Sequence, residues 1–142
     1  MALIQWSADL QLNIESVDKQ HHKLVELLNS LDEAKQSGKG SRVMGELLQN
    51  LIDYTVEHFA HEEKLMIETD YPDLALHQTQ HKQLVEKVLA FQHQFLHGGQ
   101  RITKEVLQFL KYWLESHILK DDMAFGDFAA APEKQEALAN VT

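Results

Sequence analysis

Residues 44–65, MGELLQNLIDYTVEHFAHEEKL, carry one row of side chains at alternating steps of four and three. This spacing is that of a single face of an α-helix. The face is apolar along its first half, but it continues through His58 and Glu62. Burying a carboxylate is costly unless the carboxylate is paired or bound to a metal. The stretch therefore predicts a buried helix whose core-facing side includes polar side chains that need a partner or a metal ion.

Three other stretches repeat the pattern, with histidine again on the apolar face. Short turns containing glycine or Tyr71-Pro72 separate them, and Asp18 is expected to cap the first helix. We expect an all-α, up-down-up-down antiparallel four-helix bundle, formed by a single domain over residues 1–142. Its predicted parts are an N-terminal arm at 1–16, helices at about 18–37, 41–69, 72–97 and 101–120, and a tail at 121–142 with a short helix after Pro132.

The composition narrows the class of protein. The chain has 142 residues, of which 44% are hydrophobic, and this suits one core. Its net charge of −9 and the absence of Lys or Arg before Lys19 argue against nucleic acid and membrane surfaces as partners. With no spanning segment and no signal-peptide pattern, we expect a cytoplasmic protein. Because the chain has no cysteine, any metal site must use His, Asp and Glu.

One histidine on each predicted helix stands 17 or 18 residues from a turn glycine at the same end of the bundle. At about 1.5 Å per residue, all four lie roughly 26 Å from that end and share one layer. The pairs are His21 with Gly38, His58 with Gly40, His81 with Gly98, and His117 with Gly99. A whole layer of buried imidazoles favours a metal site over ordinary hydrogen-bonded core histidines.

Further candidate ligands lie close to this layer. His58 with Glu62 and His77 with His81 are i, i+4 pairs, so each pair shares a helix face. Asp122 is five residues after His117, about 140° round an ideal helix, and joins the layer only if the helix loosens or ends there. With two bridging carboxylates and one bridging oxygen from solvent, this set would leave one position free around two octahedral ions. Imidazole and carboxylate suit iron, manganese and zinc alike.

These residues resemble the hemerythrin family, and most closely its bacterial single-domain members. The resemblance covers roughly residues 4–125 and includes Trp6 in the arm. It is carried by Val17-Asp18-Lys19-Gln20-His21, by His58-Phe59-Ala60-His61-Glu62-Glu63 with Met66, by Tyr71-Pro72 with His77 and His81, and by Trp113-Leu114 with His117, Ile118 and Asp122.

The resemblance implies a non-haem centre of two iron ions joined by an oxo or hydroxo bridge. Glu62 and Asp122 would bridge the ions as well. One iron would be saturated, and the other would be five-coordinate and would hold dioxygen reversibly as hydroperoxide. The implied ligands are His77, His81 and His117 for the first iron and His21 and His58 for the second. The implied pocket around dioxygen is lined by Phe59, Trp113, Leu114 and Ile118.

The implied function is therefore oxygen binding, for transport or storage, and not enzymatic catalysis. Dioxygen is the expected partner, with an unidentified oxygen-using partner protein left open. A di-iron oxidoreductase, or an oxygen or iron sensor with the same site, is the alternative. A ferritin-like oxidase is disfavoured because no Glu in the chain has His three residues later. His22 and the pair His93 and His97 are interpreted as surface residues, and His61 as flanking the layer.

Overall fold

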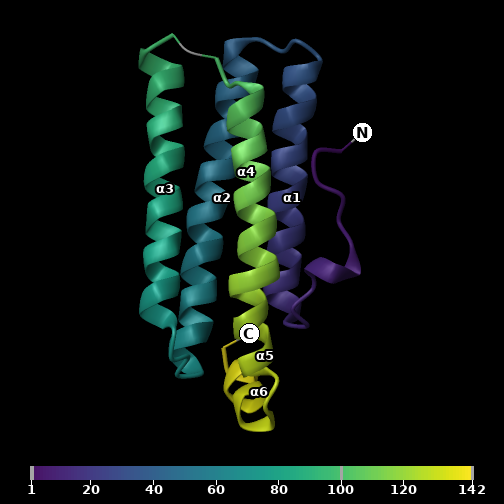
Figure 1. The fold of residues 1–142 in the computed structure, drawn as a ribbon, viewed down its shortest axis with the longest axis vertical. Helices are drawn as coiled ribbons and strands as arrows, with labels where there is room; N and C mark the ends of the chain where they lie inside the picture. The colour runs from purple at the N-terminus through teal and green to yellow at the C-terminus, as the bar shows by residue number, and fades with distance from the viewer. Residues whose placement is uncertain (1, 100, 142) are drawn as a thin grey trace.

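The computed structural model describes residues 2–99 and 101–141, which form helices and turns without a strand. Residues 1, 100 and 142 lie outside the described residues; they fall in the predicted arm, between the predicted third and fourth helices, and at the end of the predicted tail. The described residues form four long helices that run alternately up and down in Figure 1. They are α1 (Glu15–Gln36), α2 (Ser41–Glu68), α3 (Leu74–His97) and α4 (Lys104–Ser116).

The first helix begins three residues earlier than predicted, and the prediction that Asp18 caps it is wrong. Ile14 precedes α1 as its N-cap residue, and it offers no polar side chain to the free amides. Asp18 lies inside the first turn, where its carboxylate accepts hydrogen bonds from the backbone amides of Leu12 (2.7 Å) and Asn13 (3.0 Å). Asp18 therefore fastens the end of the arm to the helix.

The last long helix differs most from its predicted range. It begins at Lys104, not 101, because the Thr103 hydroxyl caps it by accepting a hydrogen bond from the backbone amide of Val106. It also continues past residue 120. Its α-helical part gives way to a π-helical turn, η2 (His117–Asp122), and then to α5 (Met123–Ala129). A separate helix, α6 (Pro132–Ala139), follows with Pro132 at its start, where a missing amide proton costs nothing.

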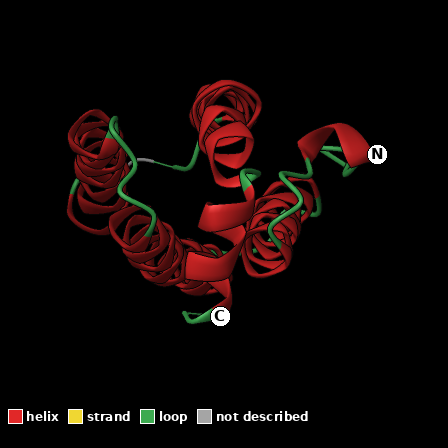
Figure 2. Cartoon of the chain, turned by 90° about the horizontal axis from the view of Figure 1, so that it is seen from below, coloured by secondary structure: helices red, strands yellow, loops and turns green. Residues whose placement is uncertain are grey.

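The long helices enclose one apolar core. Helix α1 packs along α2, α2 along α3, and α4 against α1. Seen from the lower end, the helices surround a common interior, and the short C-terminal helices lie across that end (Figure 2). The turns at the opposite end contain Gly38 and Gly99, whose φ angles of 71° and 66° suit glycine. Such turns bring consecutive helices back alongside each other.

The N-terminal arm contains a short 3-10 turn, η1 (Ala8–Leu10), and packs against the outside of the bundle. It buries Ile4, Leu10 and Leu12 against the core. The Asn29 side chain holds Ile4 at both backbone groups, with hydrogen bonds of 2.8 and 2.9 Å. None of the helices in the described residues combines the length and hydrophobicity needed to cross a membrane.

Candidate metal centre

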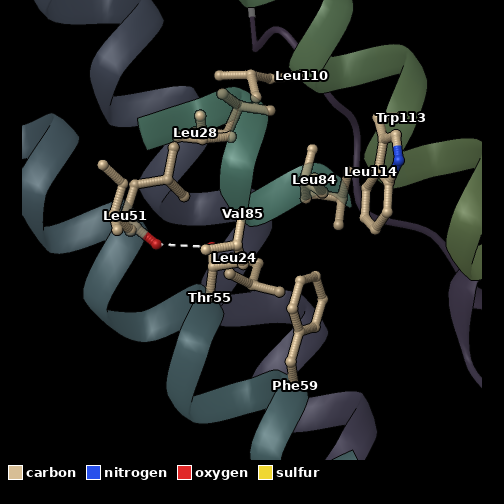
Figure 3. A pocket seen from close by; sticks show the side chains of 12 residues that line it. Leu24, Leu28, Leu51, Thr55, Phe59, Leu84, Val85, Leu110, Trp113 and Leu114 are labelled. Carbon is tan, nitrogen blue, oxygen red and sulfur yellow. Dashed lines mark hydrogen bonds between the residues drawn. The ribbon is translucent and has the colours of Figure 1, made fainter. Parts of the chain in front are cut away.

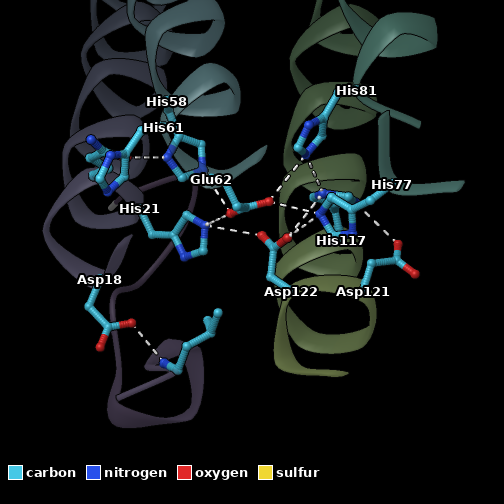
Figure 4. A network of polar contacts seen from close by, with 12 residues as sticks. Asp18, His21, His58, His61, Glu62, His77, His81, His117, Asp121 and Asp122 are labelled. Atoms are coloured by element: carbon cyan, nitrogen blue, oxygen red, sulfur yellow. Dashed lines mark hydrogen bonds and ion pairs between the residues drawn. The ribbon is translucent and has the colours of Figure 1, made fainter. Parts of the chain in front are cut away.

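The structure brings together all seven side chains that the sequence predicts as metal ligands. They come from α1, α2, α3 and the π-helical turn that follows α4, and each is at least 96% buried. In Figure 4 the imidazoles surround the carboxylates of Glu62 and Asp122. The seven are His21 on α1, His58 and Glu62 on α2, His77 and His81 on α3, and His117 and Asp122 at the two ends of η2.

Each of the histidines turns its Nε2 atom toward a carboxylate. His77 Nε2 lies 2.8 Å from Oε1 of Glu62 and 2.8 Å from Oδ1 of Asp122. On the opposite side, His21 Nε2 lies 3.0 Å from Oδ2 of Asp122 and 3.4 Å from Oε2 of Glu62. His58 Nε2 is 3.3 Å from the same Glu62 oxygen. One oxygen of each carboxylate therefore faces one group of histidines, and its other oxygen faces the other group.

These atoms form two overlapping sets of donors, each drawn together within 4.8 Å. Both sets contain Glu62 and Asp122. One set adds three histidines and the other adds two: His77, His81 and His117 in the first, and His21 and His58 in the second. Two neighbouring cations that share both carboxylates would fit this arrangement.

Several donor atoms in the layer are left without a hydrogen bond. His21 Nε2, Glu62 Oε2 and Asp122 Oδ2 are buried and have no hydrogen-bond partner among the described residues. The Nε2 atoms of His81 and His117 face each other at 3.1 Å, although neutral imidazoles that donate from Nδ1 to Glu63 and Asp121 have no Nε2 proton to share. Buried polar atoms without partners are rare in native proteins. Their convergence here fits a metal-binding role.

The electrostatics of the site favour ionised carboxylates. Burial raises the pKa of Glu62, but the close contacts with His21 and other histidines outweigh it and hold that pKa well below its usual range. Burial and the Glu62 charge raise the pKa of Asp122, yet contacts with the histidines leave it lowered as well. Burial lowers the pKa of His21 and of His77, but Asp122 and Glu62 raise both to about 9. Protons on two histidines thus balance the two carboxylates when no cation does.

Sequence reasoning missed a second layer of side chains behind the histidines. The Nδ1 atom of His81 donates to Oε2 of Glu63 at 2.7 Å, and that of His117 donates to Oδ2 of Asp121 at 3.1 Å. His58 Nδ1 donates to the side-chain oxygen of Gln20 at 2.7 Å. The i, i+4 spacing of His117 and Asp121 could have indicated one of these contacts. The other two join different helices and have no signal in a single sequence.

The remaining histidines lie outside the layer. The Nε2 atom of His61 lies 2.9 Å from the Ser16 hydroxyl. The pKa of His61 is lowered, mainly because the ring is partly buried. His22 stacks on Trp6 with ring centroids 4.9 Å apart. His93 and His97 are exposed near the far end of α3. These positions agree with the interpretation of these residues as flanking or surface groups.

An apolar cavity of about 40 Å³ lies in the core next to the metal layer. Three of the four predicted pocket residues line it: Phe59, Trp113 and Leu114 (Figure 3). Ile118 is buried but does not line this cavity. The Thr55 hydroxyl also borders it, but that hydroxyl donates to the backbone oxygen of Leu51, so its polar group is engaged.

Aromatic rings separate this cavity from the histidines. Phe59 stacks on His81 with ring centroids 3.7 Å apart and planes only 2° from parallel. Trp113 stacks on His117 at 4.4 Å and 19°. These rings fix the faces of two candidate ligands and present apolar surface to the cavity.

Comparison with known proteins identifies close relatives. The family model described as Hemerythrin HHE cation binding domain matches residues 12–129. The chain is 38% identical to a bacteriohemerythrin of Stenotrophomonas maltophilia (strain R551-3), over 96% of this chain and 88% of that one. It is 33% identical to the bacteriohemerythrin of Methylococcus capsulatus, over 92% of this chain and all of that one. The fold resembles a crystal structure of wild-type hemerythrin with a TM-score of 0.83 at 32% identity, over 92% of this chain and 100% of that one.

Proposed function

Because the chain belongs to the hemerythrin family, we propose that it binds dioxygen reversibly at a non-haem di-iron centre, as an oxygen carrier or store. We propose that the four long helices form an up-down-up-down antiparallel bundle within a single domain. When bound, a pair of ferrous ions supplies the electrons that reversible dioxygen binding requires. The chain's own side chains hold the ions, keep water away and leave room for the gas.

In this proposal the two overlapping donor sets hold one ion each. His77, His81 and His117 would hold the first ion, and His21 and His58 would hold the second. Glu62 and Asp122 would offer one oxygen to each side, which their placement between the two groups of histidines supports. Imidazole nitrogen and carboxylate oxygen suit iron.

The observation that carries the proposal is the unequal number of histidines in the two sets. If both ions share the two carboxylates equally, the ion held by His21 and His58 has one protein ligand fewer than the other ion. That shortage is what a small diatomic ligand needs. We therefore place dioxygen on the side of His21 and His58.

The apolar cavity supports the same function. Phe59, Trp113, Leu114 and Ile118 are proposed to keep the dioxygen side dry, so that water and protons do not reach bound oxygen. Dryness favours release of dioxygen over its conversion to free peroxide. On this ground we propose a binding protein and not an oxidase, with an unidentified oxygen-using protein to take up the gas.

The test is anaerobic reconstitution with ferrous iron. We expect two irons per chain and a visible absorption band that forms when oxygen is added and disappears when it is removed. Two irons with irreversible bleaching and release of peroxide would instead support a di-iron oxidoreductase. Failure to bind iron would contradict both functions.

A further inference from the structure

The groups behind the histidines differ between the two donor sets. On the three-histidine side, Nδ1 of His81 and Nδ1 of His117 each donate to a carboxylate, from Glu63 and Asp121 respectively. On the two-histidine side, His58 donates to the neutral amide oxygen of Gln20. Nδ1 of His21 is buried and has no hydrogen-bond partner among the described residues. The outer layer is therefore anionic on one side and neutral on the other.

From this asymmetry we propose that Glu63 and Asp121 are positioning residues that make the three-histidine position the first and tighter of the two metal positions to fill. The inference rests on the di-iron centre proposed above and adds an order of loading to it. Neither residue touches the proposed ions; each acts through the imidazole whose Nδ1 proton it accepts.

The first part of the argument is orientation. An imidazole whose Nδ1 carries the proton must present Nε2 as the free donor, and its hydrogen bond also fixes the rotation of the ring. For His81 the Glu63 contact is 2.7 Å, and the Phe59 ring stacked 3.7 Å away fixes the ring from its face. His117 is held likewise by Asp121 and by the ring of Trp113. Both ligands are preorganised before a cation arrives.

The second part is basicity. A carboxylate that accepts the Nδ1 proton pushes electron density into the ring and makes Nε2 a stronger donor than an amide partner does. The side chains of Glu63 and Asp121 are 24% and 26% exposed, so solvent weakens this effect without removing it. Their two negative charges also lie nearer to the three-histidine position. Orientation, donor strength and charge all favour the same position.

The other position lacks these supports. His21 must be held by packing alone at its Nδ1 side, and the Gln20 amide gives His58 direction but no charge. We therefore expect the two ions to load in sequence, with the weaker ion on the side proposed for dioxygen. Iron would be lost from that side first.

The experiment is an anaerobic titration of the metal-free chain with ferrous iron in competition with a coloured chelator. Wild type should bind two ions with unequal affinity. Glu63→Gln and Asp121→Asn should each weaken the tighter ion by about 10- to 100-fold. Gln20→Leu should weaken only the second ion, whereas Gln20→Glu should tighten it. Glu68→Gln and Asp127→Asn make the same change of charge at exposed sites and should leave both affinities unchanged.

A His21→Ala background isolates the three-histidine position. In that background one ion should remain bound, Glu63→Gln should still weaken it, and Gln20→Glu should have no effect. Circular dichroism verifies that each variant stays helical. In the loaded chain, Glu63→Gln should also raise the reduction potential, because a weaker imidazole donor stabilises the ferric state less. A purely structural role for Glu63 would not move that potential.

The failures are distinguishable. Two ions of equal affinity that respond equally to every variant would overturn the loading order and leave the di-iron centre standing. Unchanged tight binding in both Glu63→Gln and Asp121→Asn would do the same. A wild-type chain that binds no iron would overturn the proposed function and this inference together.

Discussion

Nε2 of His117 and Oδ1 of Asp122 lie 3.2 Å apart although Asp122 is five positions further along the chain. In an α-helix that separation turns the second side chain about 140° away from the first. The two residues are the first and last of the π-helical turn, whose wider i to i+5 repeat brings them onto one face. The local change of helix type thus places the Asp122 carboxylate in the histidine layer.

The role of Asp122 can be tested by removing its carboxylate. Asp122→Ala should lower the iron bound per chain from two to one or fewer. The adjacent Asp121 should not replace it, because its carboxylate lies behind His117 and binds Nδ1. Metal analysis after anaerobic reconstitution measures the effect, with exposed Asp127→Ala as the control. Two irons in the Asp122→Ala chain would remove this residue from the ligand set.

Oxygen binding should depend on the histidines of the two-histidine set. His21→Ala or His58→Ala should abolish reversible oxygen binding while the chain stays helical, because dioxygen is placed on the ion that they hold. Oxygen-dependent absorbance measures the loss. The matched control is His22→Ala, which should bind oxygen normally. His22 follows His21 in the chain, but its side chain is half-exposed and contacts Glu26. Wild-type oxygen affinity in either ligand variant would refute the placement.

Leu114 is expected to protect the centre from oxidation. Leu114→Ala should enlarge the cavity that Leu114 lines and speed autoxidation to the oxygen-inert diferric form several-fold, because water and protons gain access. The decay of the oxygenated spectrum gives the rate. Leu119→Ala removes the same atoms from an exposed position and should have no effect. An unchanged rate in Leu114→Ala would exclude Leu114 from this role.

The metal-free chain should lose stability as the pH rises. The pKa values of His21 and His77 are raised from 6.5 to about 9, so their charged forms stabilise the fold fully below pH 6.5, and this contribution is lost as the pH passes about 9. Each loss is on the order of 3 kcal/mol at most. Thermal unfolding should show a lower melting temperature at the alkaline end of this range.

Iron should reverse this trend, because protons and metal compete for the same nitrogens and affinity for ferrous iron rises as His21 and His77 are deprotonated. A melting temperature of the metal-free chain that rises between pH 6.5 and 9 would contradict the raised pKa values. The lowered pKa values of Glu62 and Asp122 act at acid pH and do not interfere in this window.

The contact between the arm and α5 should tolerate no added methyl group. A Cβ atom at Gly126 would lie 3.2 Å from both the Cβ and the backbone oxygen of Leu12. We expect Gly126→Ala to destabilise the chain by about 1–3 kcal/mol in chemical denaturation. Gly45→Ala is the control, because its Cβ would meet only Phe95 at 3.4 Å, and it should add roughly 0.5–1 kcal/mol of helix propensity. Equal effects would show that the arm moves aside freely.

The sequence predicted the helical class and the gathering of the layer because both follow from regular geometry. The fixed rise of an α-helix, counted from the turn glycines Gly38, Gly40 and Gly99, places His21, His58 and His117 at one level. The all-helical structure confirms the class, and the seven candidate ligands do lie together. Their roles as iron ligands stay a prediction.

Other features could not be predicted because they depend on tertiary contacts. The π-helical turn has no composition that separates it from the α-helix around it, so ideal helix geometry cannot by itself bring Asp122 into the layer. Because Asp is common at helix caps, the sequence predicts a capping role for Asp18, but its partners are amides of an arm with no regular period. Helix α5 is beyond sequence reasoning for a similar reason, because it is packed through distant residues: Gly126 lies against Leu12 of the arm, and Phe125 lies against Tyr71.

The spread of the candidate ligands over the whole chain also bears on biosynthesis. His117 is translated 96 residues after His21, and Asp122, which belongs to both donor sets, follows it. A growing chain therefore offers the cell's free metals only fragments of a site. Both sets of donors are complete only after Asp122 has been translated, so metal can occupy the whole proposed centre only from that point onward.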